Sequence, residues 1–95
     1  DSFFGPHEDV PFSSEDLEID FEAEIAIVTD DVPMGVSPAD AARHIKLIML
    51  MNDWTARALT RSELPKGFGF VQSKPPCSFS PVAVTPDEFG AAWDG

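Results

Sequence analysis

Apolar and polar residues alternate along residues 19–28, which read IDFEAEIAIV, with an apolar side chain at every second position. Successive side chains of a β-strand point to opposite faces, so this pattern predicts a strand over residues 17–28 with one apolar face. The same period places Glu22 and Glu24 side by side on the other face, about 7 Å apart along the chain. Two neighbouring carboxylates in so hydrophobic a strand need either water or a cation beside them.

A helix and a second strand are predicted downstream. The sequence SPAD at residues 37–40 combines an N-cap serine, a proline at the first helical position and an acid at the position of a capping box. It predicts a short amphipathic helix that runs to about Lys46. The apolar run at residues 47–51 fits either a continuation of this helix or a buried strand. We favour a strand that ends at Asp53.

Proline and glycine separate these elements, and the fold class follows from their order. A turn leading into a short extended segment is expected at residues 1–12, a turn at 29–36 and an irregular loop at 66–79. A last short strand at residues 79–84 precedes a second helix start, TPDE, at residues 85–88. We therefore expect an α+β fold with mixed or antiparallel strands and one main helix.

Length and charge narrow the classes of partner. The chain has 95 residues, of which 43% are hydrophobic, enough for one small domain with a modest core. Its 17 acidic and 6 basic residues give a net charge of −11. Because no basic stripe is present to neutralise phosphates, nucleic acids and anionic membranes are not expected as partners. A cation is the natural partner of such a chain.

Cysteine content and hydropathy indicate the compartment. Cys77 is the single cysteine, so no internal disulfide forms, and a reducing, cytoplasmic setting is expected. Neither an apolar run of about 18 residues nor a basic leader followed by an apolar stretch is visible. The chain starts at Asp1 and stops inside an expected helix, so we interpret residues 1–95 as one segment of a longer protein. A sheet without its neighbouring strands leaves unpaired edges, which predicts a homo-oligomer.

The two strand glutamates can be interpreted as ordinary residues of a hydrated sheet face or as part of a functional site. In a chain with 17 acids an E-x-E pair arises easily by chance, and a hydrated sheet face would display it. On a covered face, two carboxylates about 5 Å apart repel by roughly 3 kcal/mol at an effective dielectric of about 20. Mg²⁺ removes that repulsion, since it prefers oxygen ligands at about 2.1 Å. A third acid that converges on the pair decides between the two interpretations. The candidate is Asp53, which lies at the exit of an apolar run.

Three segments, DFEAEIAIV, MNDWTAR and FVQSKPPCSFSPVAV, together resemble the fumarylacetoacetate hydrolase family. The specific part is the spacing: Asp53 of N-D-x-[ST]-A-R lies 29 residues after Glu24, and Lys74 of S-K-P lies 21 residues after Asp53. The resemblance extends over residues 3–93. It implies that the chain is a fragment of the fumarylacetoacetase-type β-roll, the central part of a catalytic domain.

The resemblance also implies a metal site. The family's divalent ion, usually Mg²⁺, with Ca²⁺ or Mn²⁺ as alternatives, would be held by Glu22, Glu24 and Asp53. Lys74 matches the family's active-site lysine, which helps to hold the enolate-like charge that forms as a carbon–carbon bond breaks. Arg57 matches a motif arginine that contacts substrate or pairs structurally near the site.

Thr60 stands where eukaryotic fumarylacetoacetases have a substrate-contacting glutamine, which disfavours fumarylacetoacetate itself as substrate. The implied reaction is metal-assisted hydrolysis of a small 1,3-diketo acid of the fumarylacetoacetate or acylpyruvate type. The alternatives are a decarboxylase or isomerase of 2-oxo acids, or an inert fragment that self-associates. The family's catalytic histidine comes from a segment before the E-x-E strand, so we expect this fragment to have little or no turnover alone.

Overall fold

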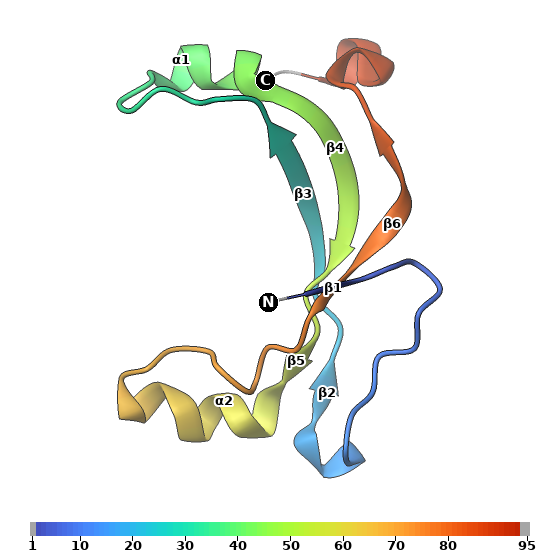
Figure 1. Ribbon diagram of the computed structural model, residues 1–95, viewed down its shortest axis with the longest axis vertical. Helices are drawn as coiled ribbons and strands as arrows, with labels where there is room; N and C mark the ends of the chain where they lie inside the picture. Colours follow the sequence, from blue (N-terminus) through green and yellow to red (C-terminus); the bar gives the residue numbers. More distant parts are fainter. Residues whose placement is uncertain (1, 94–95) are drawn as a thin grey trace.

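The computed structural model describes residues 2–93 and has an α+β architecture, as the sequence predicts (Figure 1). The strands are β1 (Phe3–Phe4), β2 (Ile19–Asp20), β3 (Ala23–Thr29), β4 (Ile45–Asn52), β5 (Thr55–Ala56) and β6 (Cys77–Val84). The helices are α1 (Pro38–Ala41) and α2 (Arg57–Glu63). Four 3₁₀ segments join them within the described residues: η1 (Glu15–Leu17), η2 (Ala42–His44), η3 (Leu64–Lys66) and η4 (Pro86–Ala92).

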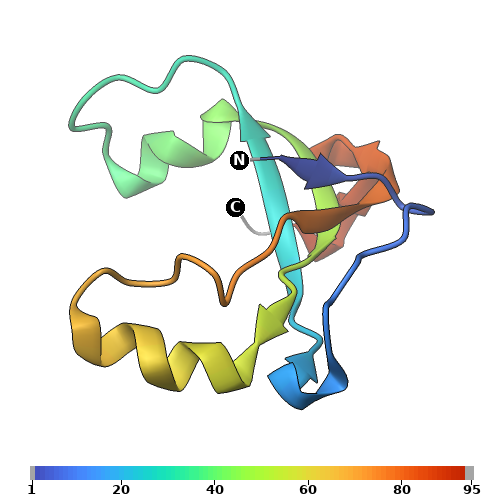
Figure 2. The same cartoon turned by 60° about the horizontal axis from the view of Figure 1, so that its bottom comes forward.

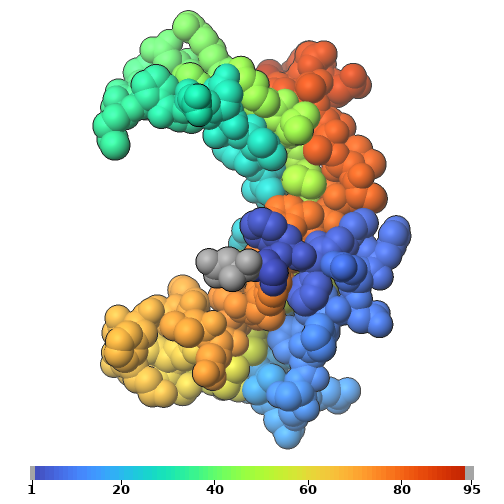
Figure 3. Space-filling model, in the orientation of Figure 1, coloured from blue at the N-terminus to red at the C-terminus, as the bar shows by residue number. Residues whose placement is uncertain are grey.

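The strands form a four-stranded mixed sheet and a separate two-stranded ribbon. The larger sheet has the order β1-β6-β4-β3, with β3–β4 and β4–β6 antiparallel and β1–β6 parallel. The ribbon pairs β2 with β5 in antiparallel fashion. The register of the larger sheet shifts between Val28 and Thr29 and again between Met49 and Met51. Such irregularities bend a strand, and the sheet is strongly curved, with α1 and α2 at opposite ends of a hollowed crescent (Figures 1 and 3).

The strand expected over residues 17–28 is interrupted, which corrects the sequence interpretation. Residues 15–17 form η1, and the chain leaves strand geometry between β2 and β3, at Phe21 and Glu22. Both residues give their N–H groups to side chains: Phe21 to Asp20 Oδ1 at 2.9 Å and Glu22 to Asn52 Oδ1 at 3.0 Å. These bonds replace ladder hydrogen bonds. Glu22 therefore lies in the break and Glu24 lies in β3.

The helix expected from residue 37 to about Lys46 is shorter than predicted. Its start is confirmed, since Ser37 Oγ accepts the Asp40 N–H at 3.2 Å and donates to Asp40 Oδ2 at 2.7 Å. α1 ends at Ala41, η2 continues to His44, and β4 begins at Ile45. Pairing of Ile45 with Thr29 of β3 requires extended backbone there, so strand pairing overrides helix propensity. The ambiguous run at residues 47–51 is a strand, as favoured.

The later part of the chain contains one helix that the sequence analysis does not predict. α2 has no side-chain cap at Ala56, so the usual start signal is missing. Its end passes into η3, which Gly67 closes with a φ of 79° that favours glycine. β6 begins at Cys77, two residues before the predicted strand, and the second predicted helix start leads into η4, a 3₁₀ segment.

The core of the described residues is small. Ile48, in the middle of β4, is 5% exposed, whereas Leu50 on the same face is 64% exposed. Ile48 lies between Ile27 of β3 and Val84 of β6. Other large apolar side chains of the sheet are also open to solvent, including Ile25 and Val82. Strand pairing and a few central side chains therefore hold the sheet together.

We expect Ile48→Ala to lower the free energy of unfolding of this chain by about 2 to 4 kcal/mol, because it leaves a cavity between three strands. Leu50→Ala, on the same strand and the same face, is the matched control and should cost less than about 1 kcal/mol. Urea unfolding followed by circular dichroism measures both. Equal losses would contradict the packing described here.

Candidate metal centre

Three carboxylates from two segments of the chain converge at the end of the β3–β4 hairpin. Glu22 precedes β3, Glu24 is its second residue, and Asp53 directly follows β4. Antiparallel pairing of Ala23 with Asn52 brings these points together, and the Asp53 N–H donates to the Glu22 carbonyl at 3.0 Å. One oxygen from each of Glu22, Glu24 and Asp53 lies within 4.8 Å of the other two. The structure thus brings Asp53 to the E-x-E pair, and metal binding by the three residues stays a prediction.

Two of these carboxylates are largely withdrawn from water. The side chains of Glu22 and Asp53 are 23% and 22% exposed, while Glu24 is exposed. The carboxylates of Glu22 and Asp53 are therefore only partly hydrated. An ionised group in such a place needs a partner of opposite charge.

Lys74 provides that partner in this structure. Its Nζ donates to Glu22 Oε2 at 2.5 Å, to Asp53 Oδ2 at 2.9 Å and to Thr55 Oγ1 at 2.7 Å. The three acceptors match the three protons of an ammonium group. Thr55 is fully buried and Lys74 is 21% exposed, so the arrangement is shielded on one side. The sequence predicts Lys74 as a site residue but gives no sign of Thr55, because the role of Thr55 depends on tertiary contact.

The ionisation of these groups follows from their contacts. The hydrogen bond from Lys74 lowers the pKa of Glu22 below its ordinary value, although burial opposes this. Burial raises the pKa of Asp53, but the bonds from Lys74 and Cys77 outweigh it and the net direction is downward. Burial likewise opposes the charge on Lys74, yet Glu22 and Asp53 raise the pKa of its ammonium. All three groups are charged at neutral pH.

Arg57 holds Glu22 from its other side. Its Nε donates to Asp20 Oδ2 at 2.8 Å, and a terminal guanidinium nitrogen donates to Glu22 Oε1. Arg57 lowers the pKa of Asp20, and Asp20 raises that of Arg57. The contact corresponds to the pairing role that the sequence analysis left open; substrate contact by Arg57 stays a prediction. Asp20, the third member of this group, is a residue the sequence analysis missed.

Thr60 is placed on α2 with its hydroxyl 3.5 Å from the carbonyl of Ala56, one helical turn back. Within residues 2–93 the Thr60 hydroxyl makes no hydrogen bond to the carboxylate cluster. Its predicted part in substrate binding stays a prediction.

Cys77 contributes a hydrogen bond that the sequence analysis does not foresee. Its Sγ donates to Asp53 Oδ1 at 3.2 Å. Burial, followed by this contact with Asp53, raises the pKa of the thiol to about 11, so it stays protonated. A protonated thiol is a poor nucleophile, so this contact assigns Cys77 a structural part in the site. Both oxygens of Asp53 are thus engaged, one by Lys74 and one by Cys77.

A cavity of about 600 Å³ opens on this cluster. Asp53 and Lys74 form part of its wall, and the Phe70 ring lies with its centroid 5.9 Å from Lys74 Nζ. The other lining residues are largely apolar or uncharged: Ser2, Phe3, Val71, Gln72, Pro75, Pro76 and Cys77. A small molecule in this cavity would meet one carboxylate of the cluster and the lysine together.

The residues present fit a hard divalent cation. Glu22, Glu24 and Asp53 offer carboxylate oxygens, the donors that Mg²⁺ and Ca²⁺ prefer. Together with Asp20 the three carboxylates carry four negative charges, and Lys74 and Arg57 carry two positive charges. The two negative charges that remain match a divalent ion. Within residues 2–93 the Glu24 side chain makes no hydrogen bond or ion pair of its own, so it is free to bind such an ion.

The chain belongs to the family described as Fumarylacetoacetate (FAA) hydrolase C-terminal, whose model matches residues 1–95. This confirms the family resemblance drawn from the three sequence segments. No match is found among curated proteins. In the described part of the chain, no helix has the length and hydropathy needed to cross a membrane.

Lys74→Met should lower the melting temperature of the metal-free chain by about 5 °C at pH 7, because Asp53 loses its cation and Glu22 keeps only Arg57. Both carboxyls have folded-state pKa values below their ordinary 4.5 and 3.8. The stabilisation by the pairs is therefore complete above pH 4.5 and is lost as the pH falls below 3.8 through the folded-state values. Thermal unfolding in EDTA between pH 3 and pH 7 measures this. A difference between the two proteins that is independent of pH would contradict the ion pairs.

Proposed function

We propose that this chain supplies the metal-binding part of the active site of an enzyme that cleaves a carbon–carbon bond in a 1,3-diketo acid, of the fumarylacetoacetate or acylpyruvate type. The observation that carries the proposal is the convergence of Glu22, Glu24 and Asp53 beside Lys74 at a cavity. Membership of the fumarylacetoacetate hydrolase family gives the chemical class in which this geometry is interpreted.

On this proposal Glu22, Glu24 and Asp53 would hold Mg²⁺, with Ca²⁺ or Mn²⁺ as alternatives. When bound, the ion would supply Lewis-acid polarisation and a template for the oxygens of the substrate. Arg57 keeps Glu22 in place through Oε1, and the backbone N–H of Asp53 fixes the neighbouring Glu22 carbonyl. These contacts orient the ligand side chains before anything binds.

Lys74 has an electrostatic role in the proposed reaction. Lys74 lines the cavity together with Asp53, and the contacts of its ammonium keep it protonated. A fixed positive charge there stabilises the negative charge that develops on the enolate as the carbon–carbon bond breaks. Thr55, fully buried, and the Phe70 ring limit where the ammonium can lie.

Activation of water on this account needs a base from another part of the protein. His44 Nδ1 bonds to Asp30 Oδ1 at 2.6 Å, at the opposite end of the β3–β4 hairpin from the cluster. His7 is exposed in the turn after β1. We therefore expect the isolated chain to bind a metal ion with little or no turnover.

A second candidate function, assembly without catalysis, is favoured by the exposed apolar side chains of the sheet. Ile25, Leu50 and Val82 are each more than 60% exposed. In this reading the chain forms a homo-oligomer through open sheet surfaces, and its acids only carry charge. A measurement of metal binding distinguishes between the two candidate functions.

Glu24→Gln is the clean test of the metal site, because Glu24 is the cluster member that does not pair with Lys74 or Arg57. We expect the mutation to weaken Mn²⁺ binding by at least about tenfold with little change in melting temperature. Glu15→Gln, in η1, is the charge-matched control and should bind like the wild type. Calorimetric titration measures both. Undiminished binding by Glu24→Gln would favour the second candidate.

Turnover is tested in the intact protein that contains this chain, with an acylpyruvate, fumarylacetoacetate and oxaloacetate as substrates. We expect hydrolysis of a 1,3-diketo acid, and a fall in kcat of about 100-fold or more in Lys74→Met. Mn²⁺ should bind that variant more tightly, since a competing positive charge is gone. Lys66→Met, which changes an exposed lysine of η3, is the control. Turnover of oxaloacetate alone would assign the protein as a decarboxylase and would contradict its assignment as a hydrolase.

A further inference from the structure

The segment that carries Lys74 has little apolar packing of its own. It runs from Gly67 to Pro76, between η3 and β6, and lies alongside α2 in both ribbon views (Figures 1 and 2). Phe68 is 80% exposed and Val71 is 64% exposed. A cavity of about 430 Å³ separates part of the loop from the helix. Something other than hydrophobic contact must therefore fix the loop.

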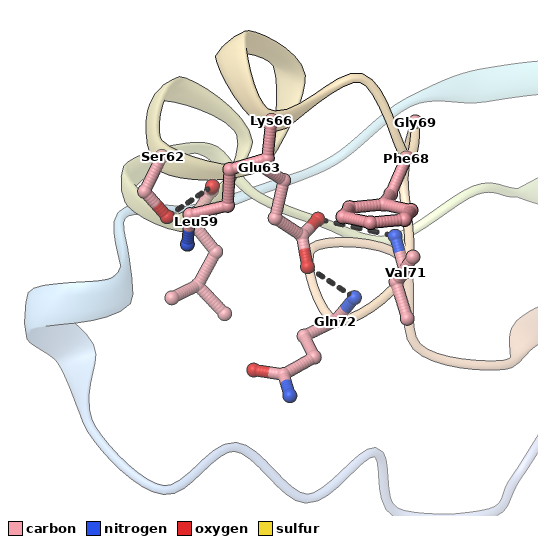
Figure 4. A pocket seen from close by; sticks show the side chains of 8 residues that line it. All are labelled: Leu59, Ser62, Glu63, Lys66, Phe68, Gly69, Val71 and Gln72. Carbon is pink, nitrogen blue, oxygen red and sulfur yellow. Dashed lines mark hydrogen bonds between the residues drawn. The ribbon is translucent and has the colours of Figure 1, made fainter.

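Glu63, the last residue of α2, fixes it through its carboxylate, which bonds directly to the loop (Figure 4). Oε1 accepts the Gln72 N–H at 2.6 Å. Oε2 accepts the N–H groups of Val71 and Ser73, each at 3.1 Å, and the Ser73 hydroxyl at 2.7 Å. One side chain thus collects four hydrogen bonds from three consecutive residues.

This arrangement requires an anion. Three successive backbone N–H groups that point at one place form a concave positive site, which a carboxylate fills and a neutral group fills poorly. The bonds from Ser73 and Gln72 lower the pKa of Glu63 to about 2, so it is ionised throughout the neutral range. Gly69, with a φ of 77°, gives the backbone the freedom to make the bend that precedes these residues.

The contacts continue from Glu63 to the cluster through Ser73. Ser73 is fully buried, and its carbonyl accepts the Ala56 N–H at 2.8 Å. The residue is therefore held from both ends of α2, by Ala56 just before the helix and by Glu63 at its end. Lys74 follows directly, and its ammonium reaches Thr55, the neighbour of Ala56.

We infer that Glu63 is a positioning residue for the active site: its carboxylate fixes residues 71–73 so that the Lys74 ammonium is held between Glu22 and Asp53. The contacts from Glu63 through residues 71–73 to Lys74 are observed in the structure, whereas their consequence for catalysis rests on the proposed function. Glu63 itself acts through Lys74 and touches no cluster member within the described residues.

Chemical labelling tests the positioning directly in the intact protein. Acetic anhydride should acetylate Lys74 slowly relative to Lys46 of the same molecule, because three acceptors hold its ammonium. In Glu63→Gln, whose amide cannot accept all four bonds, we expect the Lys74 rate to rise by about fivefold or more. Ser62→Ala is the matched control, since the Ser62 hydroxyl bonds to the Leu59 carbonyl of its own helix. An unchanged Lys74 rate in Glu63→Gln overturns the inference.

Mn²⁺ titration of four proteins tests whether Glu63 acts through Lys74: wild type, Glu63→Gln, Lys74→Met and the double variant. A loosened ammonium competes less with the ion, so Glu63→Gln should tighten binding by about threefold to tenfold. In the Lys74→Met background it should have no effect. Equal shifts in both backgrounds would contradict the inference, since a merely structural role needs no lysine. Absence of Mn²⁺ binding in the wild type would refute the proposed function, while the labelling rates still decide the link from Glu63 to Lys74.

Discussion

The ion pairs between Lys74 and the carboxylates of Glu22 and Asp53 are the interaction on which the rest of the site depends. Carboxylate oxygens within 4.8 Å of one another repel strongly where water is partly excluded. The fold tolerates this because an ammonium with a raised pKa lies against two of the three acids. The break before β3 places Glu22, the register of the hairpin places Asp53, and the loop after α2 places Lys74.

The lysine that stabilises the metal-free cluster also opposes a metal ion there. An ammonium in contact with Glu22 and Asp53 shares their negative charge, so the same contacts that hold the chain together in the absence of metal weaken its affinity for a cation. If the proposed function holds, a site with this balance would bind a divalent ion moderately and would keep a fixed positive charge next to it. In the proposed reaction that charge would stabilise the negative charge that develops on the substrate.

The sequence predicted those parts of the site that depend on local pattern and short spacing. The alternation around Glu22 and Glu24 indicated a strand, and the position of Asp53 after an apolar run indicated its place at the exit of β4. The break at Glu22 was not predictable, because an amide 30 residues away, that of Asn52, takes its N–H. α2 lacked a capping side chain, and the bonds of Glu63 span eight to ten residues and belong to no helical or strand period. The signal that could have drawn attention to Glu63 is an acid at the end of a helix before a loop rich in glycine.

Crystals of the intact protein grown with Mn²⁺ would show whether the three carboxylates bind a metal ion, because anomalous diffraction locates the ion without reference to any assay. We predict one anomalous peak among the side-chain oxygens of Glu22, Glu24 and Asp53, with Lys74 beside it. A manganese-loaded crystal with no peak at this position, and with Lys74 still bonded to both Glu22 and Asp53, would contradict this prediction.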